Sequence, residues 1–517
     1  MTRREHQRNS TPGGLCRTAC MAVISLMMHV AGAVGAATDS PDWTQVTRFN
    51  GTSSGPLDGL GCSVDARDNW IVIGEREDAS TRARSGSVYG LDAKTRELMV
   101  KITLLDAGQT DDLFGSSVAV WGNRVLIGDP GTSRFKLFGG AAYLYRLLDG
   151  RQLAVYSPPY HRVYDKLGTD VDLNDKYAVI SAPHPDGSDQ PGYVAVYSAQ
   201  TDRHLARLSP PNATVYDKFG TSLALHDHVL AVGAPERERL GLRTGAVYVY
   251  DLADQSIRYM LEPPDIASNN FGCDVAVNAT VLVVGASAEK YGPHMSGSVY
   301  LFDLASGALL QRLTSPLTQR SMRFGAAVAA DDHFAIIGTA LFQGLDPSPD
   351  TPVIVLELPS GDIADVLYPP NSDDVWSHYG NAVAIDSDND RIVVGASRAT
   401  QNSRSNGAAY IYAPQFSLYT EGRCPGVIDV VAITTDSDDR VHFYRSDETD
   451  PGTGPVVGRC GDLRLDLTTP VLVGSAAPVD NEARLSRRFS DPLCRPQYLQ
   501  AVQARSACRV SNVILVE

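Results

Sequence analysis

The feature that most constrains the fold of this chain is a short motif, an aromatic residue or leucine followed by glycine. The seven glycines of this motif are Gly61, Gly115, Gly168, Gly220, Gly272, Gly325 and Gly380. Successive copies are separated by 54, 53, 52, 52, 53 and 55 residues. A period this regular indicates a repeat architecture, in which each copy is one supersecondary unit that stacks on its neighbours.

Each repeat has the same internal order of apolar and turn segments. A short strand follows the repeat glycine, and a continuous apolar strand then ends in a corner of small residues, as at 229–235. A third strand opens with glycine, as at 245–250, and a fourth runs into a proline-rich loop such as 209–211. Four short antiparallel strands per repeat are typical of a propeller blade, and the apolar second strand fits a position buried between blades. The sequence therefore predicts an all-β fold, a seven-bladed β-propeller of four-stranded antiparallel blades.

The clearest copy of the repeat combines Phe-Gly at 219–220 with Gly-Ala-Pro at 233–235. This pattern resembles the FG-GAP repeat family, which is found in the propeller of integrin alpha subunits and in many secreted or surface proteins. The resemblance covers about residues 43–415 and implies a propeller that serves binding or adhesion. The sixth repeat departs most, because Gly-Thr-Ala at 338–340 replaces the corner and Pro352 stands where glycine usually opens the third strand.

The two ends of the repeat array predict how the ring closes. The seventh repeat reaches its third strand at residues 408–412 and shows no fourth strand before the C-terminal region begins. Residues 44–49, just upstream of the first repeat, have the pattern of a fourth strand. We expect this N-terminal strand to complete blade 7, because it would cover two sheet edges that otherwise promote aggregation.

The N-terminus is typical of an export signal. Four arginines precede an apolar run over residues 21–37, and small residues stand where a signal peptidase would cut, near Ala36 or Ala37. We therefore divide the chain into a signal peptide at 1–37, a propeller at 38–415 and a small domain at 416–517. An uncleaved anchor is the alternative. With the signal removed, we expect a secreted or cell-surface protein with no membrane span.

The C-terminal region at 416–517 is predicted to be a small β domain stabilised by disulfides. An even set of cysteines in an exported chain favours two disulfides, and three pairings remain open. Zinc is the alternative, although no C-x-x-C spacing supports it. The four residues are Cys424, Cys460, Cys494 and Cys508. Elsewhere, Cys62 and Cys273 are expected to be buried small residues, and Asn50, Asn212 and Asn278 head sequons that would permit glycosylation in a eukaryotic host.

The resemblance also raises the question of calcium, since integrin blades carry aspartate-rich calcium loops between their first two strands. The matching hairpin here contains Asp386, Asp388 and Asp390. Alternating carboxylates in a tight loop can converge on one hard cation. However, Arg391 and Val394 stand where the family loop has glycine and a further aspartate. The hairpin is thus either one degenerate calcium site or a solvated turn, and no other cofactor is predicted.

Function is predicted to reside in the loops. The formal net charge of −15 argues against nucleic-acid binding, and no catalytic constellation is visible. The loop after the second corner combines cationic and apolar groups, which suits recognition, although packing against a neighbouring loop is the alternative. Its residues are Arg134, Phe135, Lys136 and Phe138.

We therefore expect a non-catalytic binding or adhesion module for an extracellular protein or glycan. The alternatives are a propeller that supports an extracellular enzyme, such as a hydrolase, and a purely structural surface protein. An acid pair with perturbed pKa or a metal in the central channel would favour the enzyme, whereas a bare channel with an apolar patch on the rim would favour the binding module.

Overall fold

The computed structural model describes most of residues 43–414 and a set of strands beyond them. Up to residue 414, the described ranges are 43–52, 59–78, 85–104, 112–135, 137–157, 163–183, 190–265, 270–291, 294–315, 323–339, 352–369, 377–386, 391–401 and 404–414. Beyond residue 414, the described residues are those of the strands β35 to β42, whose bounds are given below. The proposed signal peptide and the four C-terminal cysteines lie outside the described residues.

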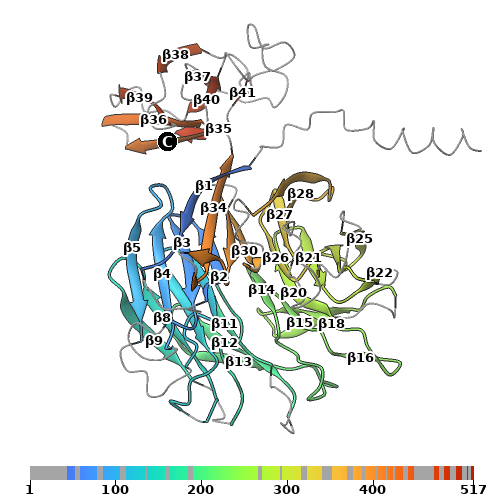
Figure 1. The fold of residues 1–517 in the computed structure, drawn as a ribbon. Helices are drawn as coiled ribbons and strands as arrows, with labels where there is room; N and C mark the ends of the chain where they lie inside the picture. The colour runs from blue at the N-terminus through green and yellow to red at the C-terminus, as the bar shows by residue number, and fades with distance from the viewer. Residues whose placement is uncertain are drawn as a thin grey trace, which may run out of the picture. The chain divides into compact units, whose positions relative to one another are not determined.

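The described residues form a seven-bladed propeller of four-stranded antiparallel sheets, as the repeat predicts (Figure 1). Blade 1 consists of β2 (Leu60–Arg67), β3 (Trp70–Glu75), β4 (Ser87–Asp92) and β5 (Leu98–Thr103). Blade 2 consists of β6 (Ser117–Trp121), β7 (Arg124–Asp129), β8 (Ala141–Arg146) and β9 (Arg151–Tyr156). Blade 3 consists of β10 (Val171–Leu173), β11 (Tyr177–Ala182), β12 (Tyr193–Ser198) and β13 (His204–Leu208). Blade 4 consists of β14 (Leu223–His226), β15 (Val229–Ala234), β18 (Ala246–Asp251) and β19 (Ser256–Leu261). Blade 5 consists of β20 (Phe271–Val277), β21 (Val281–Ala286), β24 (Ser298–Asp303) and β25 (Leu309–Thr314). Blade 6 consists of β26 (Ala327–Ala330), β27 (Phe334–Gly338), β28 (Val353–Glu357) and β29 (Ile363–Leu367).

Blade 7 is built from both ends of the array. Its strands run in the order β1 (Trp43–Phe49), β34 (Ala408–Pro414), β31 (Arg391–Ala396) and β30 (Tyr379–Asp386). Figure 1 shows β1, in dark blue, beside β34, in orange, and Trp43 is the Cα partner of Pro414 in this antiparallel pair. The strand expected over residues 44–49 is therefore β1, and it supplies the fourth strand of the last blade.

Trp43 also ties this closing strand to blade 6. Its backbone N–H donates a hydrogen bond to Asp365 Oδ2 at 2.8 Å, and its indole packs edge-on against Phe334 at 6.2 Å between ring centroids. Trp43 is buried, so the first residue of β1 is anchored on two blades at once.

The blades pack through their repeat aromatics. Phe114 is fully buried and lies edge-on to Tyr143 and Tyr145, at centroid distances of 5.6 and 6.0 Å. It belongs to a core cluster shared by blades 1 and 2, and similar clusters lie between other neighbouring blades. The continuous apolar second strands predicted to be buried are buried in these interfaces.

The loop after the corner and the loop before the repeat aromatic lie at the same end of a blade. In blade 2 the N–H of Gly131 donates to the carbonyl of Asp112 at 3.0 Å, and in blade 4 the N–H of Glu236 donates to the carbonyl of Asp217 at 3.3 Å. We call this end of the propeller the loop face. Three short hairpins continue it, namely β16 (Glu238–Arg239) with β17 (Leu242–Arg243), β22 (Lys290–Tyr291) with β23 (His294–Met295), and β32 (Thr400–Gln401) with β33 (Arg404–Ser405).

The irregular sixth blade keeps the fold by a side-chain hydrogen bond. Thr339, at the altered corner, is buried and donates from Oγ1 to the carbonyl of Pro352 at 3.0 Å. This bond joins the corner to the start of the third strand at the place where the other repeats rely on small residues and glycine.

The C-terminal region contains two antiparallel sheets. One has three strands, β35 (Phe416–Gly422), β36 (Gly426–Thr434) and β39 (Glu482–Phe489). The other joins β37 (Val441–Ser446), β38 (Val471–Ala476), β40 (Gln497–Gln503), β41 (Arg509–Val510) and β42 (Ile514–Val516). Within the described part of the chain, no helix is long and apolar enough to cross a membrane.

Candidate functional site

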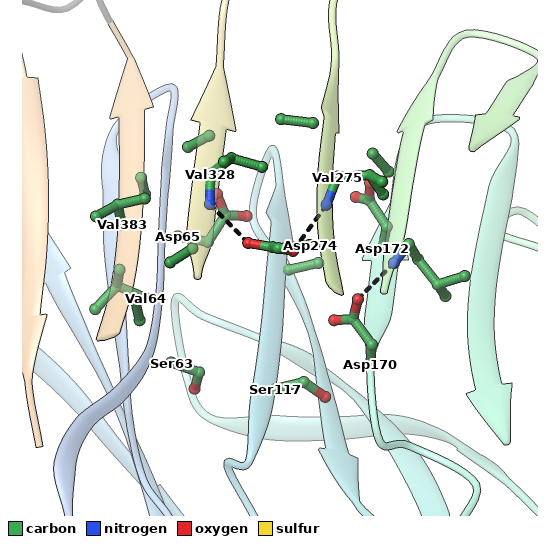
Figure 2. Close-up of a pocket in the computed structure, with 18 of the residues that line it drawn as sticks. Ser63, Val64, Asp65, Ser117, Asp170, Asp172, Asp274, Val275, Val328 and Val383 are labelled. Atoms are coloured by element: carbon green, nitrogen blue, oxygen red, sulfur yellow. Dashed lines mark hydrogen bonds between the residues drawn. The ribbon is translucent and has the colours of Figure 1, made fainter. Parts of the chain in front are cut away.

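The first strands of the seven blades converge on a central channel with a volume of about 550 Å³. Figure 2 shows part of its wall, where residues of neighbouring first strands, among them Asp65, Asp172 and Asp274, line the channel. Because a β-strand is pleated, every second side chain faces the same side. The channel is a concave feature that could admit a ligand, so its chemistry bears on whether it can be an active site.

Four aspartates on these first strands form bridges between blades. In blade 3, Asp172 Oδ1 accepts from the N–H of Leu173 at 2.7 Å, and its Oδ2 accepts from the N–H of Leu225, in blade 4, at 2.6 Å. Figure 2 shows the same arrangement for Asp274, which lies between the amides of Val275 and Val328. The bonds to the next blade are Asp65 with Val120 at 2.7 Å, Asp170 with Leu223 at 2.6 Å and Asp274 with Val328 at 2.7 Å.

The environment of the channel disfavours the charged form of these carboxyls. Burial raises the pKa of Asp172 to about 7, and the nearby charge of Asp65 adds to this. Burial raises the pKa of Asp170 to about 7 with help from Asp274, and the pKa of Asp274 itself rises to about 7 for the same reason. The backbone amides oppose the shift, since they favour the anion. Burial therefore favours the protonated form of Asp170, Asp172 and Asp274 more than it does for an exposed aspartate.

Sequence reasoning missed these aspartates as a group. Their signal is their place in the repeat, two or four residues after the repeat glycine, on the strand predicted to line the channel. Both oxygens of each carboxyl are held by backbone amides, which gives them a structural role in fastening blades. Throughout the described residues, His, Cys, Asp and Glu side chains do not gather in groups of three or more that could hold a metal ion.

The two channel cysteines are free thiols and half-buried. Cys62 Sγ lies 3.4 Å from the carbonyl of Gly115, and Cys273 Sγ lies 3.3 Å from the carbonyl of Gly325, each in the next blade. Burial raises the pKa of both thiols, so they are poor nucleophiles at neutral pH. In blade 1 the next residue, Ser63, donates from its hydroxyl to the same Gly115 carbonyl at 2.8 Å, as Ser222 does to the carbonyl of Gly272 at 3.0 Å.

On the loop face, two loops join to form an exposed apolar surface. The N–H of Tyr164 donates to the carbonyl of Leu137 at 2.9 Å, and the ring of Phe138 stacks on that of Tyr164 at 5.6 Å with an interplanar angle of 19°. We call the exposed side chains of these loops the aromatic patch. They are Leu137, Phe138, Val163 and Tyr164, with exposed fractions of 48, 37, 45 and 45%.

The predicted recognition loop thus divides between surface and core. Phe138 lies in the aromatic patch, whereas Phe135 is half-buried and packs against the core between blades 1 and 2. Arg134 is exposed, with its guanidinium 5.7 Å from the centre of the Phe135 ring. Lys136 lies outside the described residues. Tyr164 and Val163, which complete the patch, come from the neighbouring blade and could not be assigned to it from sequence.

The backbone of the aromatic patch is held in an uncommon conformation. Phe138 has φ of +46° and Tyr164 has φ of +62°, a region of backbone conformation that residues other than glycine rarely adopt. Such residues persist only where the surrounding structure enforces them, and they concentrate at binding sites. Among the ion pairs of the described residues, none includes the exposed cations Arg134 and Lys166 beside the patch.

The predicted calcium hairpin is described only at its base. Asp386 is the last residue of β30 and the Cα partner of Arg391. Asp388 and Asp390 lie outside the described residues, as do Cys424, Cys460, Cys494 and Cys508.

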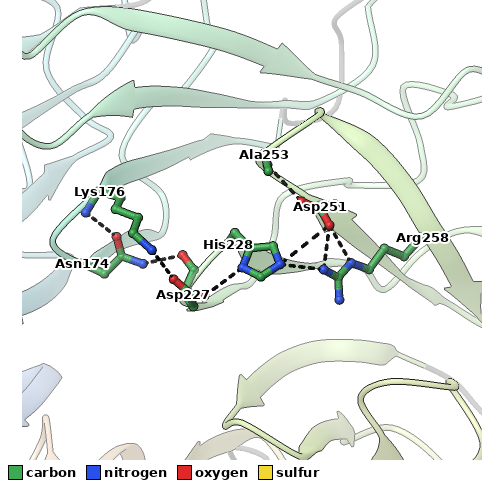
Figure 3. A network of polar contacts seen from close by, with 7 residues as sticks. All are labelled: Asn174, Lys176, Asp227, His228, Asp251, Ala253 and Arg258. Carbon is green, nitrogen blue, oxygen red and sulfur yellow. Dashed lines mark hydrogen bonds and ion pairs between the residues drawn. The ribbon is translucent and has the colours of Figure 1, made fainter.

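At the opposite ends of the first strands, polar networks connect neighbouring hairpins (Figure 3). Asn174 Nδ2 donates to the carbonyl of Asp227 at 2.8 Å, and Lys176 Nζ pairs with Asp227 Oδ1 at 2.5 Å. These contacts lower the pKa of Asp227 to about 2, chiefly through Lys176 and then through His228. Because Arg258 donates to His228 Nε2, the Nδ1 of His228 carries the proton that faces Asp227.

The sequon asparagine Asn278 performs the same task as Asn174 between blades 5 and 6. It is buried, its Oδ1 accepts from the N–H groups of Thr280 and Val281, and its Nδ2 donates to the carbonyl of Asp331 at 2.7 Å. A glycan on the Asn278 side-chain amide is incompatible with these buried hydrogen bonds. Asn212, by contrast, is exposed.

These features define the protein as a closed seven-bladed β-propeller whose blades derive from one repeat. Its residues 97–145, 203–250, 261–302 and 374–412 match the FG-GAP repeat, which is consistent with an FG-GAP propeller. Among solved structures, the WD40 repeats of RRP9 are similar at 12% identity, with a TM-score of 0.48, over 72% of this chain and 99% of that chain. No curated protein sequence matches the chain.

Proposed function

We propose that the protein is an extracellular, non-catalytic binding module, and that the aromatic patch receives an apolar segment of a protein partner. The observation that carries the proposal is the patch itself, four exposed apolar side chains from two blades on the loop face. Loops on a rigid scaffold are the usual place for recognition, and FG-GAP propellers are binding and adhesion modules.

The stacking of Phe138 on Tyr164 favours a protein over a glycan. Sugars bind to the open faces of aromatic rings, and here each ring covers a face of the other. Aliphatic Leu137 and Val163 complete the surface, which suits the apolar anchors at the centre of protein interfaces. The enforced backbone means that little conformational entropy is lost when a partner binds.

The exposed cations beside the patch indicate the kind of segment it would take. Arg134 and Lys166 are exposed and belong to the same two loops as the patch, so a partner segment with carboxylates beside its apolar anchor is complementary. Such rim charges chiefly raise the association rate and reduce binding to wrong partners.

The test is capture of partners from the extracellular fluid of the source organism with the immobilised mature chain. We expect a protein that binds the wild-type chain, is lost with the double variant Phe138→Ser/Tyr164→Ser, and is retained with Leu240→Ser. Leu240 is a matched control because it is an exposed apolar residue, 84% accessible, on the β16–β17 hairpin. Loss with neither variant, or equal loss with both, would contradict a patch-specific interface, and selective loss of a glycan would reassign the ligand class.

One observation favours a second function, catalysis in the channel. Carboxyls with pKa near 7 are suited to general acid–base chemistry, and Asp170, Asp172 and Asp274 have such values. If the channel were catalytic, any hydrolytic activity of the purified chain would survive removal of residues 416–517 and would be lost in Asp172→Asn. We favour binding because backbone amides hold both oxygens of each carboxyl.

A further inference from the structure

In three blades a buried tyrosine donates to a buried carboxylate near the loop face, and a half-buried cation lies beside the pair. In blade 1, Tyr89 donates to Glu75 at 2.7 Å, and the Nζ of Lys101 lies 5.0 Å from the centre of the Tyr89 ring. In blade 5, Tyr300 donates to Glu289 at 2.8 Å, and Arg312 contacts that carboxylate. In blade 3, the partners are Tyr193, Asp165 and Arg207. In each case a cation from the fourth strand accompanies the acid.

Blade 2 has the tyrosine and two buried acids, as blade 1 has Glu75 and Asp78, but no cation of its fourth strand stands opposite the tyrosine. Tyr143 is the Cα partner of Val155, whereas Tyr89 faces Lys101 and Tyr300 faces Arg312 at the same register. Asp129 replaces the alanine of the Gly-Ala-Pro corner, and the charge of Asp112 acts on it. All three side chains, Tyr143, Asp129 and Asp112, are buried.

The carboxylate of Asp129 is an unexplained group in this interior. Among the described residues, no group meets normal hydrogen-bond geometry with either of its oxygens or with the hydroxyl of Tyr143, in contrast to the tyrosines of blades 1, 3 and 5. The nearby cation Arg134 is exposed, and it partly offsets the effect of burial on the pKa of the Tyr143 hydroxyl. Burial and then Asp112 raise the pKa of Asp129 well above its ordinary value. Buried carboxyl groups in proteins are protonated, paired with a cation or bound to a metal, and an unsatisfied one calls for an explanation of this kind.

We propose that blade 2 binds one divalent metal cation of the hard, oxygen-seeking class, held by Asp129 and Asp112 with the hydroxyl of Tyr143. Two carboxylates neutralise a divalent ion, and carboxylate, hydroxyl and backbone carbonyl oxygens are the ligands that such ions take. The ion occupies the role that Lys101 and Arg312 have in blades 1 and 5. This site lies below the recognition loop, is distinct from the hairpin containing Asp386, and does not depend on the proposed partner.

Thermal unfolding of the chelator-treated full chain, with and without millimolar CaCl2 or MgCl2, tests the proposal. An ion that binds only the folded state raises the midpoint, here by at least about 2 °C for the wild-type chain. Asp129→Ala restores the corner residue of blades 4, 5 and 7, so it should fold and show no metal-dependent rise. Asp386→Asn should respond like the wild type.

A charge-replacement variant provides an independent readout. Val155→Lys places an ammonium at the register of Lys101, so it should be as stable without metal as the wild type is with metal, and should lose the metal response. The proposal is overturned if neither ion raises the wild-type midpoint, if Asp129→Ala keeps the full rise, or if only Asp386→Asn removes it. If neither ion raises the wild-type midpoint, the carboxyls of Asp129 and Asp112 share a proton and hold no metal ion.

Discussion

The α-carbon of Gly233 in blade 4 lies directly against the carbonyl oxygen of Gly272 in blade 5. A Cβ on Gly233 would be 2.1 Å from that oxygen, well inside van der Waals contact. The two glycines of the repeat therefore serve different needs. Gly272 adopts φ of +82°, which requires glycine for its backbone, whereas Gly233 has no positive φ and requires glycine because of the close approach of the next blade.

Replacing Gly233 by alanine should lower the free energy of unfolding by about 1–3 kcal/mol, the usual cost of overpacking. Urea unfolding measures this, and Gly241→Ala is the control, because nothing lies within 4 Å of the Cβ position of Gly241 and only its φ of +78° is strained. Equal costs for the two variants would show that contact between blades is not the reason for the corner glycine.

The aspartate bridges predict a second loss of stability. Asp172→Ala leaves the amides of Leu173 and Leu225 without their acceptor, which should cost about 1–3 kcal/mol of unfolding free energy. Asp172→Asn, which retains a carbonyl oxygen, should cost less. If Asp172→Ala unfolds at the wild-type urea concentration, the carboxylate does not fasten blades 3 and 4.

The same carboxyls predict greater stability in mild acid. Their pKa is about 7 in the folded chain and about 3.9 in the unfolded chain, so between these values the folded state binds more protons. This contribution to stability is present in acid and is lost as the pH rises through 7. We expect a higher midpoint of thermal unfolding at pH 5.5 than at pH 8, and a smaller difference in the triple variant Asp170→Asn/Asp172→Asn/Asp274→Asn. The prediction would be contradicted if the unfolding midpoint rose with pH in the wild type and not in that variant, because these carboxyls would then stabilise the fold in their charged form.

Ring closure predicts the effect of removing β1. A chain that starts at Gly51 lacks the partner of β34 and the anchor of Trp43 on Asp365 and Phe334. Its open sheet edge should promote association, which size-exclusion chromatography would detect as oligomers or aggregates. A monomer as stable as the full chain would mean that β1 is dispensable for closure.

Much of this architecture is predictable from the sequence because the same motif recurs at a regular spacing. The spacing of glycines such as Gly220 and Gly272 gives the blade count, and the missing fourth strand of the last repeat predicts β1. The sites depend on contacts between repeats, which a period does not contain. Whether Phe138 faces solvent or core depends on its pairing with the loop of Tyr164, and the importance of Val155 follows only from its register opposite Tyr143.

The binding role of the aromatic patch is tested most directly by placing a photo-crosslinking phenylalanine analogue at position 138 of the full chain. Irradiation in the extracellular fluid of the source organism should yield one dominant crosslinked protein, which the same analogue at position 240 does not capture. Mass spectrometry of the adduct should locate an apolar segment flanked by carboxylates. No adduct, or the same adducts from both positions, would contradict a specific protein interface at Phe138 and Tyr164.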